Sequence, residues 1–163
     1  MTYSERRRFV ACAILLAGLA YAMPWLSGDE GIMSRAPFIL TLPDSWQMEQ
    51  PEGRYQLMNG GDYWRVLYYS PCIAVMTLEH LVLVQDAAMK EVAPGSKVKD
   101  TVPLESKSAY MRIYDLPAAP PEKSAYLVAG AVLERGAIAI TGLAPKGPAL
   151  DALKRILLSA KSR

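Results

Sequence analysis

Hydrophobic and polar residues alternate along several short segments after residue 36, a pattern typical of strands with one buried face. In the first of these segments, 38–42, the residues Phe38, Leu40 and Leu42 share one face. Further strands are predicted at 47–57 (interrupted by Pro51 and Gly53), 63–69, 97–105, 108–115, 124–134 and 136–143. The stretch 125–133 is apolar at almost every position, which predicts a central strand covered on both faces.

Two other segments have the spacing of helices. The first covers about 77–92, with Thr77 as its candidate N-cap and an earlier start at Pro71 as the alternative. The second covers about 148–160, and its predicted buried stripe consists of Leu150, Leu153 and Leu157.

The order of these elements predicts the fold class. The Asn-Gly-Gly-Asp sequence at 59–62 is a strong hairpin signal, because asparagine and glycine accept the positive φ angles that tight turns need. Hairpins dominate and no regular βαβ alternation occurs. We therefore expect an α+β domain, with an antiparallel sheet of about six to seven strands packed by two helices.

The N-terminus has the pattern of an export segment. Three arginines at 6–8 precede the apolar run 9–20, and Ala20-Tyr21-Ala22 offers small residues at the positions that a leader peptidase reads. Cleavage after Ala22 is one interpretation; an uncleaved anchor using the uncharged residues 9–28 is the other. Both interpretations place the domain outside the cytoplasm, because the arginines stay inside.

These features give the predicted domain organisation: a signal peptide or signal anchor at 1–26, a linker at 27–36 and a single α+β domain at 37–163. The localisation predicted is periplasmic, either free after cleavage or anchored in the inner membrane. Of the two cysteines, Cys12 lies in the apolar run, so Cys72 is alone in the domain and an internal disulfide is excluded.

Charge excludes two classes of partner. The formal net charge is +2, and the three N-terminal arginines outnumber Glu5 by two, so the chain beyond residue 22 is neutral. A neutral domain has no electrostatic footprint for nucleic acid and no polybasic patch for anionic lipid. Membrane contact is expected only through residues 9–28, if they are uncleaved.

Residues for catalysis or metal binding are sparse. His80 is the single histidine, so neither a histidine-based metal site nor a Ser-His-Asp triad has a full set of residues by spacing. The acidic residues are scattered rather than paired. The sequence therefore predicts a protein that is not an enzyme and that has no cofactor and no metal.

Two stripes of aromatic residues and arginine are candidate partner-binding surfaces. Tyrosine and arginine are enriched in the hot spots of protein interfaces, and alternate residues of a strand share one face. The alternative is that these are ordinary sheet residues lying under the helices. The candidate residues are Tyr110, Arg112 and Tyr114 on one strand, and Tyr63, Arg65 and Tyr69 on another.

Several short motifs resemble those of the PsbP-like and DcrB-like domains. The run Phe38-x-Leu40-x-Leu42-Pro43-Asp44-x-Trp46 resembles their opening strand, turn and tryptophan. Residues 77–81 resemble the start of the central helix, Ser108-Ala109-Tyr110 resembles a strand entry, and 153–159 resembles the closing helix. The chain departs from the family pattern at Lys107-Ser108, where the family has a glycine.

The resemblance implies an α/β/α sandwich that is used mostly as a non-catalytic interaction module. Members include photosystem II accessory proteins, envelope proteins and some immunity proteins against type VI secretion effectors. Together with the export pattern, it predicts an exported, non-catalytic envelope protein that binds another protein, with an inhibitor or immunity protein for a secreted toxin as a special case. The alternative is a module for a small apolar ligand or lipid, lined by Met58, Met76, Met89 or tyrosines.

Overall fold

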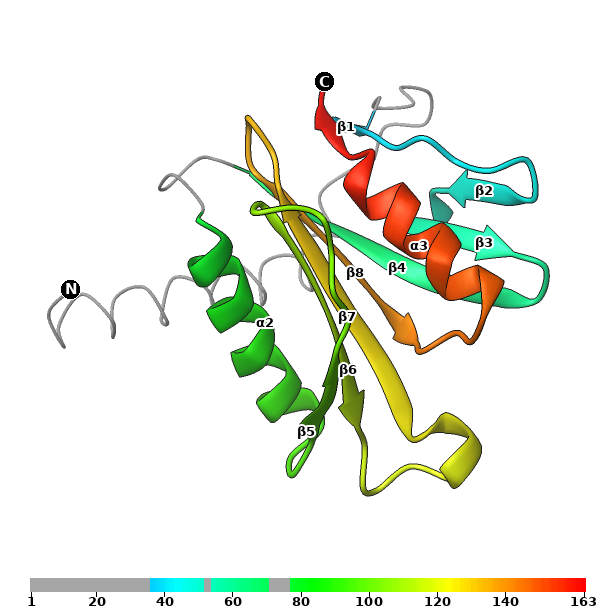
Figure 1. The fold of residues 1–163 in the computed structure, drawn as a ribbon, viewed down its shortest axis with the longest axis vertical. Helices are drawn as coiled ribbons and strands as arrows, with labels where there is room; N and C mark the ends of the chain where they lie inside the picture. The colour runs from blue at the N-terminus through cyan, green and yellow to red at the C-terminus, as the bar shows by residue number, and fades with distance from the viewer. Residues whose placement is uncertain (1–35, 52–53, 71–76) are drawn as a thin grey trace, which may run out of the picture. The chain divides into compact units, whose positions relative to one another are not determined.

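The computed structural model describes residues 36–51, 54–70 and 77–163 of the chain (Figure 1). The predicted export segment at 1–26 and all but the last residue of the predicted linker lie outside these ranges. The part that is described forms one compact unit, which begins at Ala36 and ends at Arg163. The α+β class is confirmed for this unit.

Seven antiparallel strands form the main sheet, in the order β2-β3-β4-β8-β7-β6-β5. The predicted number of strands, the central position of β7 and the hairpin at 59–62 are all confirmed. The strands are β2 (Trp46–Glu49), β3 (Tyr55–Asn59), β4 (Asp62–Tyr69), β5 (Lys97–Thr101), β6 (Ala109–Asp115), β7 (Ala125–Val132) and β8 (Ala137–Leu143).

Two of the predicted strands are longer than the strands in the structure, and prolines explain both differences. The segment 47–57 is two strands, β2 and β3, that pair as a hairpin, because Pro51 has no N–H to give to a ladder and its carbonyl instead accepts a turn bond from Arg54 N at 2.9 Å. The segment 97–105 ends as β5 at Thr101, shortly before Pro103.

The predicted strand at 38–42 is also shorter than expected. Its ordered part, β1 (Phe38–Ile39), pairs with β9 (Lys161–Ser162) in a separate two-stranded sheet. The chain leaves this ladder at Thr41, whose N–H donates to Ser159 Oγ at 2.8 Å. The predicted face is nevertheless correct, because Phe38 is buried and Leu40 and Leu42 pack against the core.

The two α-helices are α2 (Leu78–Val92) and α3 (Pro148–Leu158), and a 3₁₀ turn, η3 (Pro121–Lys123), precedes β7. Thr77 is the N-cap of α2, as predicted. The buried stripe of α3 differs from the prediction, because Leu150 is only partly buried; the stripe consists of Ala152, Leu153, Ile156 and Leu157. Within the described residues, no helix is long and apolar enough to cross a membrane.

The helices lie on opposite faces of the sheet (Figure 1). Adjacent residues of β7 divide between two apolar clusters: Leu127 and Ala129 pack with α3, whereas Val128 packs with α2. The burial of β7 on both faces was predicted from its continuous apolar sequence and is confirmed.

The two apolar clusters differ in extent. The cluster on the α3 face reaches from Trp46 on β2 to Met111 on β6, and the rings of Trp46 and Trp64 stack with centroids 5.0 Å apart. The cluster on the α2 face contains residues of β6, β7 and the neighbouring ends of β4 and β8, but none from β2 or β3. Within the described part of the chain, the residues packed on the α2 face therefore cover about half of the sheet.

A glycine determines how closely α2 approaches the sheet. Tyr110 on β6 lies directly opposite Gly130 on β7, and a Cβ added at Gly130 would lie 2.7 Å from Tyr110 Cε1 and 2.8 Å from Leu81 Cδ2. The tyrosine ring thus occupies the space that a side chain at residue 130 would need, and Leu81 of α2 packs against the same spot.

We predict that Gly130→Ala lowers the free energy of unfolding by about 1–3 kcal/mol, because Tyr110 and Leu81 must both move to admit a methyl group. Urea denaturation followed by tryptophan fluorescence measures this change. The control is Gly61→Ala, since an added Cβ at Gly61 meets nothing within 4 Å and should alter stability by less than about 0.5 kcal/mol. Equal effects of the two substitutions would contradict this account of the α2 contact.

Candidate functional site

Helix α2 presents polar residues to the sheet as well as apolar ones. Its first turn is fixed by Thr77, whose Oγ1 accepts from His80 N at 3.2 Å. Leu81, Gln85 and Met89 follow at intervals of four residues, so they form one stripe, and all three are buried. Gln85 is thus a polar residue in the middle of a buried stripe, and a buried amide requires hydrogen-bond partners.

Helix α2 lies over β7 and β6, and the alternate residues Tyr110, Arg112 and Tyr114 of β6 face it. Tyr110 is 8% exposed and Tyr114 is 4% exposed, so these two members of the first predicted stripe contact α2 rather than solvent. Arg112 is only partly covered, with 27% of its side chain exposed. This arrangement is the alternative that the sequence left open, in which the stripe lies under a helix.

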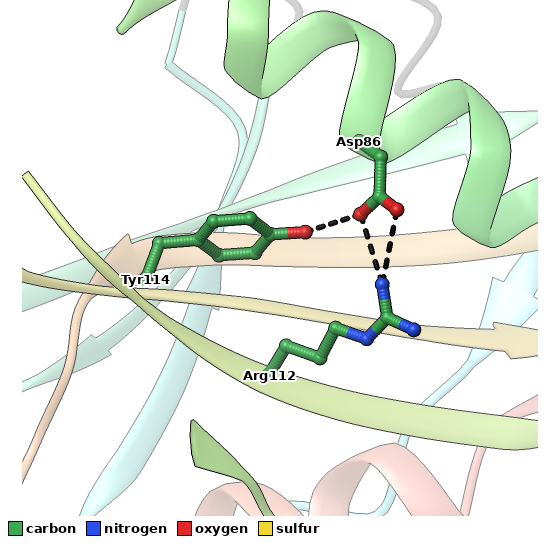
Figure 2. Close-up of polar contacts among 3 residues, drawn as sticks. All are labelled: Asp86, Arg112 and Tyr114. Atoms are coloured by element: carbon green, nitrogen blue, oxygen red, sulfur yellow. Dashed lines mark hydrogen bonds and ion pairs between the residues drawn. The ribbon is translucent and has the colours of Figure 1, made fainter. Parts of the chain in front are cut away.

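Asp86 joins the helix to this strand (Figure 2). Arg112 Nη1 lies 3.0 Å from both carboxylate oxygens of Asp86, and the Tyr114 hydroxyl donates to Oδ1 of the same carboxylate. Charge-assisted hydrogen bonds of this kind are stronger than neutral ones. The three side chains therefore hold α2 in a fixed position over β6.

A second polar contact joins α2 to β4. Gln85 Nε2 donates to the hydroxyl of Tyr69, so the third residue of the other predicted stripe is also turned toward the helix. Tyr110 lies between the two contacts: its ring centroid is 5.9 Å from Arg112 Cζ, and its buried hydroxyl has no hydrogen-bond partner in the described part of the chain. The six side chains Tyr69, Gln85, Asp86, Tyr110, Arg112 and Tyr114 are called the clamp below.

Burial controls the acidity of the tyrosines in the clamp. It raises the pKa of Tyr69 and Tyr110 above the ordinary value. Burial, and next the hydrogen bond to Asp86, raises the pKa of Tyr114 to about 12. Each of these phenols is therefore neutral at physiological pH, where it can donate a hydrogen bond but cannot act as a base.

The polar groups of the clamp connect the helix to the sheet. The Asp86 carboxylate already accepts from Arg112 and Tyr114. In the three described ranges, no three histidine, cysteine or acidic residues gather where they could hold a metal ion. The arrangement of the clamp suits a fixed helix–sheet contact.

Tyr63 and Arg65 of the second predicted stripe are placed quite differently from the first. Tyr63 is 61% exposed, and Arg65 is also exposed. The register pairs Arg65 with Thr141, Thr141 with Val128 and Val128 with Arg112, so Arg65 is on the same side of the sheet as α2. It lies on the half of this face that the α2 cluster does not reach.

Further residues extend this uncovered half-face. Met58 pairs with Tyr63 across β3 and β4 and is partly exposed. Leu143 on β8 is two residues beyond the Arg65–Thr141 pair, which brings it opposite Tyr63, and it is 45% exposed. The exposed set of Met58, Tyr63, Arg65 and Leu143 is called the open surface below.

No family model, curated protein or solved structure matches this chain. The resemblance to PsbP-like and DcrB-like domains therefore stays a prediction.

We predict that Asp86→Ala lowers the free energy of unfolding by about 1–3 kcal/mol, because it leaves Arg112 and Tyr114 without their shared acceptor under the helix. Chemical denaturation measures the loss. Asp151→Ala is the matched control: its 3.2 Å ion pair with Lys154 is on the surface of α3, with the aspartate side chain 66% exposed, and such pairs contribute little. A loss at Asp86 no larger than at Asp151 would show that the clamp does not hold α2.

The raised pKa of Tyr114 predicts a loss of stability in alkali. An unfolded tyrosine ionises near its ordinary value of 10.0, whereas Tyr114 in the folded chain resists ionisation until about 12. The stabilising effect is present in full below pH 10 and is lost as the pH rises from 10 toward 12. Over that range, the free energy of unfolding of the Tyr114→Phe variant should fall by about 1–2 kcal/mol less than that of the unsubstituted chain. Denaturation at pH 8 and pH 11 tests this, and parallel losses in both chains would refute it.

Proposed function

We propose that this chain is an exported, non-catalytic module of the cell envelope that binds another protein on the open surface. The observation that carries the proposal is the incomplete cover of one sheet face. Tyr63 and Leu143 are 61% and 45% exposed on a seven-stranded sheet whose other face has buried core residues on β2, β3 and β4. Exposed apolar and aromatic residues gathered in one place are typical of interaction sites.

The chemistry of the open surface supports a protein partner. Tyrosine, methionine and arginine are enriched in interfaces, and tyrosine and arginine contribute most to binding at hot spots. Arg65 forms no ion pair with any described residue, so its guanidinium is available for a carboxylate of a partner. The strand positions these side chains rigidly, which limits the entropy lost on binding.

Export is the second part of the proposal. It is supported by the arginines at 6–8 followed by the apolar run 9–20. Both the cleaved and the anchored forms bring the domain into contact with envelope proteins. Neutralising a secreted toxin in that compartment is a special case that suits a small rigid domain with one binding face.

The small-ligand alternative has less support from the described residues. It predicts a pocket lined by Met58, Met76, Met89 or tyrosines, but Met58 lies on the open surface and Met89 lies in the cluster under α2. Met76 is outside the described residues.

We predict that the photo-reactive amino acid p-benzoylphenylalanine, placed at Tyr63 of the full-length chain, cross-links to a protein in intact cells. Gel electrophoresis should show one discrete adduct, identified by mass spectrometry, which Arg65→Ala weakens. The control site is Leu158, another large exposed residue, which is on α3, 43% exposed and away from the open surface. The absence of any adduct at Tyr63, or an identical adduct from both sites, would overturn the proposal.

A further inference from the structure

Three residues of the α2 side form a row of acid, amide and base across neighbouring strands. Glu49 on β2 lies opposite Gln56 on β3, and Gln56 lies opposite Arg65 on β4. Glu49 and Arg65 are both exposed and carry opposite charges, one on either side of Gln56. They are not paired with each other in the chain.

We propose that the open surface binds a second copy of this chain, in a symmetric dimer whose two-fold axis runs parallel to β3, above Gln56 and midway between the two sheets. This inference rests on the proposed function, because it takes the same surface as the binding site and names its occupant. A two-fold interface is self-complementary, so residue i of one copy meets residue j of the other, and the reverse.

The proposed axis places Glu49 and Arg65 of one copy opposite Arg65 and Glu49 of the other, so two ion pairs can form. Neighbouring strands are about 4.8 Å apart, so Glu49 and Arg65 lie at similar distances on opposite sides of β3. Rotation by half a turn about an axis that lies above β3, midway between the two sheets, brings Glu49 of one copy over Arg65 of the other and, by symmetry, Arg65 over Glu49. Two complementary ion pairs result, whereas most other rotations would not match the charges.

The neighbouring row gives the apolar part of the same contact. Gln47, Met58 and Tyr63 lie opposite one another on β2, β3 and β4. The same axis places Met58 against Met58 at the centre, with Gln47 of one copy against Tyr63 of the other. Met58 and Tyr63 thus add apolar contact area beside the two charged pairs, a combination that is common in protein interfaces.

The position of α2 fits this dimer. A helix packed on a sheet forms a layer about 10 Å thick, which is also the separation of two packed sheets. The sheet of the second copy would therefore lie level with α2, and its edge strand β2 would face the side of the helix. Covering an edge strand with a helix is one of the ways in which proteins protect it.

The two edges of the sheet differ as this arrangement requires. The outer strand β5 has Lys97 and Lys99 and a register irregularity between Val98 and Asp100, both of which discourage pairing with another chain. The other outer strand, β2, has the sequence Trp-Gln-Met-Glu, with no lysine and an unbroken register. Strand β2 thus has fewer of these protective features than β5, and it is the edge that the dimer would cover.

Charge reversal tests the dimer. We expect sedimentation velocity of the full-length chain, purified in mild detergent, to show a dimer, and Arg65→Glu or Glu49→Arg alone to weaken it about tenfold or more by opposing like charges. The double variant, which exchanges the two charges, should restore the dimer. Arg155→Glu, an exposed residue of α3, is the control and should leave the dimer unchanged.

Other outcomes overturn the inference. A chain that stays monomeric, a dimer that neither single reversal weakens, or a double variant no stronger than the single ones would each exclude this axis. The cross-link at Tyr63 then distinguishes the two proposals. If the chain is monomeric and Tyr63 cross-links to a different protein, the dimer is excluded and the protein-binding function is kept. A monomeric chain with no adduct removes both.

Discussion

The close approach of Tyr110 and Leu81 to Gly130 is the contact on which the rest of the arrangement depends. With no side chain at residue 130, the tyrosine ring can lie next to β7 and α2 can pack against it. The helix is then near enough for Asp86 to reach Arg112 and Tyr114, and for Gln85 to reach Tyr69. The polar contacts of the clamp fix the position of α2 along the strands, and the glycine determines how close the helix lies to the sheet.

The width of a helix explains why part of the sheet stays open. A helix is about 10 Å across and neighbouring strands are about 4.8 Å apart, so one helix covers about two strands. With α2 fixed over β6 and β7, the described residues leave most of the β2–β3–β4 half of that face uncovered, apart from Tyr69 at the end of β4. On the α3 side, Phe38 and Trp46 extend the cover. The clamp and the open surface are thus two results of one packing arrangement.

The sequence predicted the elements better than it predicted their contacts. Turn residues, the cap at Thr77 and the continuous apolar run of β7 are local signals, and the structure confirms the elements they indicate. The two tyrosine–arginine stripes had the same local pattern, yet one is covered by α2 and the other is largely exposed, because cover depends on which strands the helix crosses. Gln85 and Asp86 were missed as site residues, although a glutamine within a buried helical stripe was a usable signal. The need for a glycine at residue 130 could not be predicted, because it depends on the cross-strand partner, Tyr110, which is identified only in the folded chain.

The central claim is that α2 covers the tyrosines of β6 and leaves the tyrosine of the open surface free in a single chain. Oxidative footprinting of the full-length protein, diluted until it is monomeric and read by mass spectrometry, measures this tyrosine by tyrosine. The account predicts rapid modification of Tyr63, with Tyr110 and Tyr114 protected until the chain unfolds. Modification of Tyr110 and Tyr114 in the folded chain at the rate of Tyr63 would contradict it.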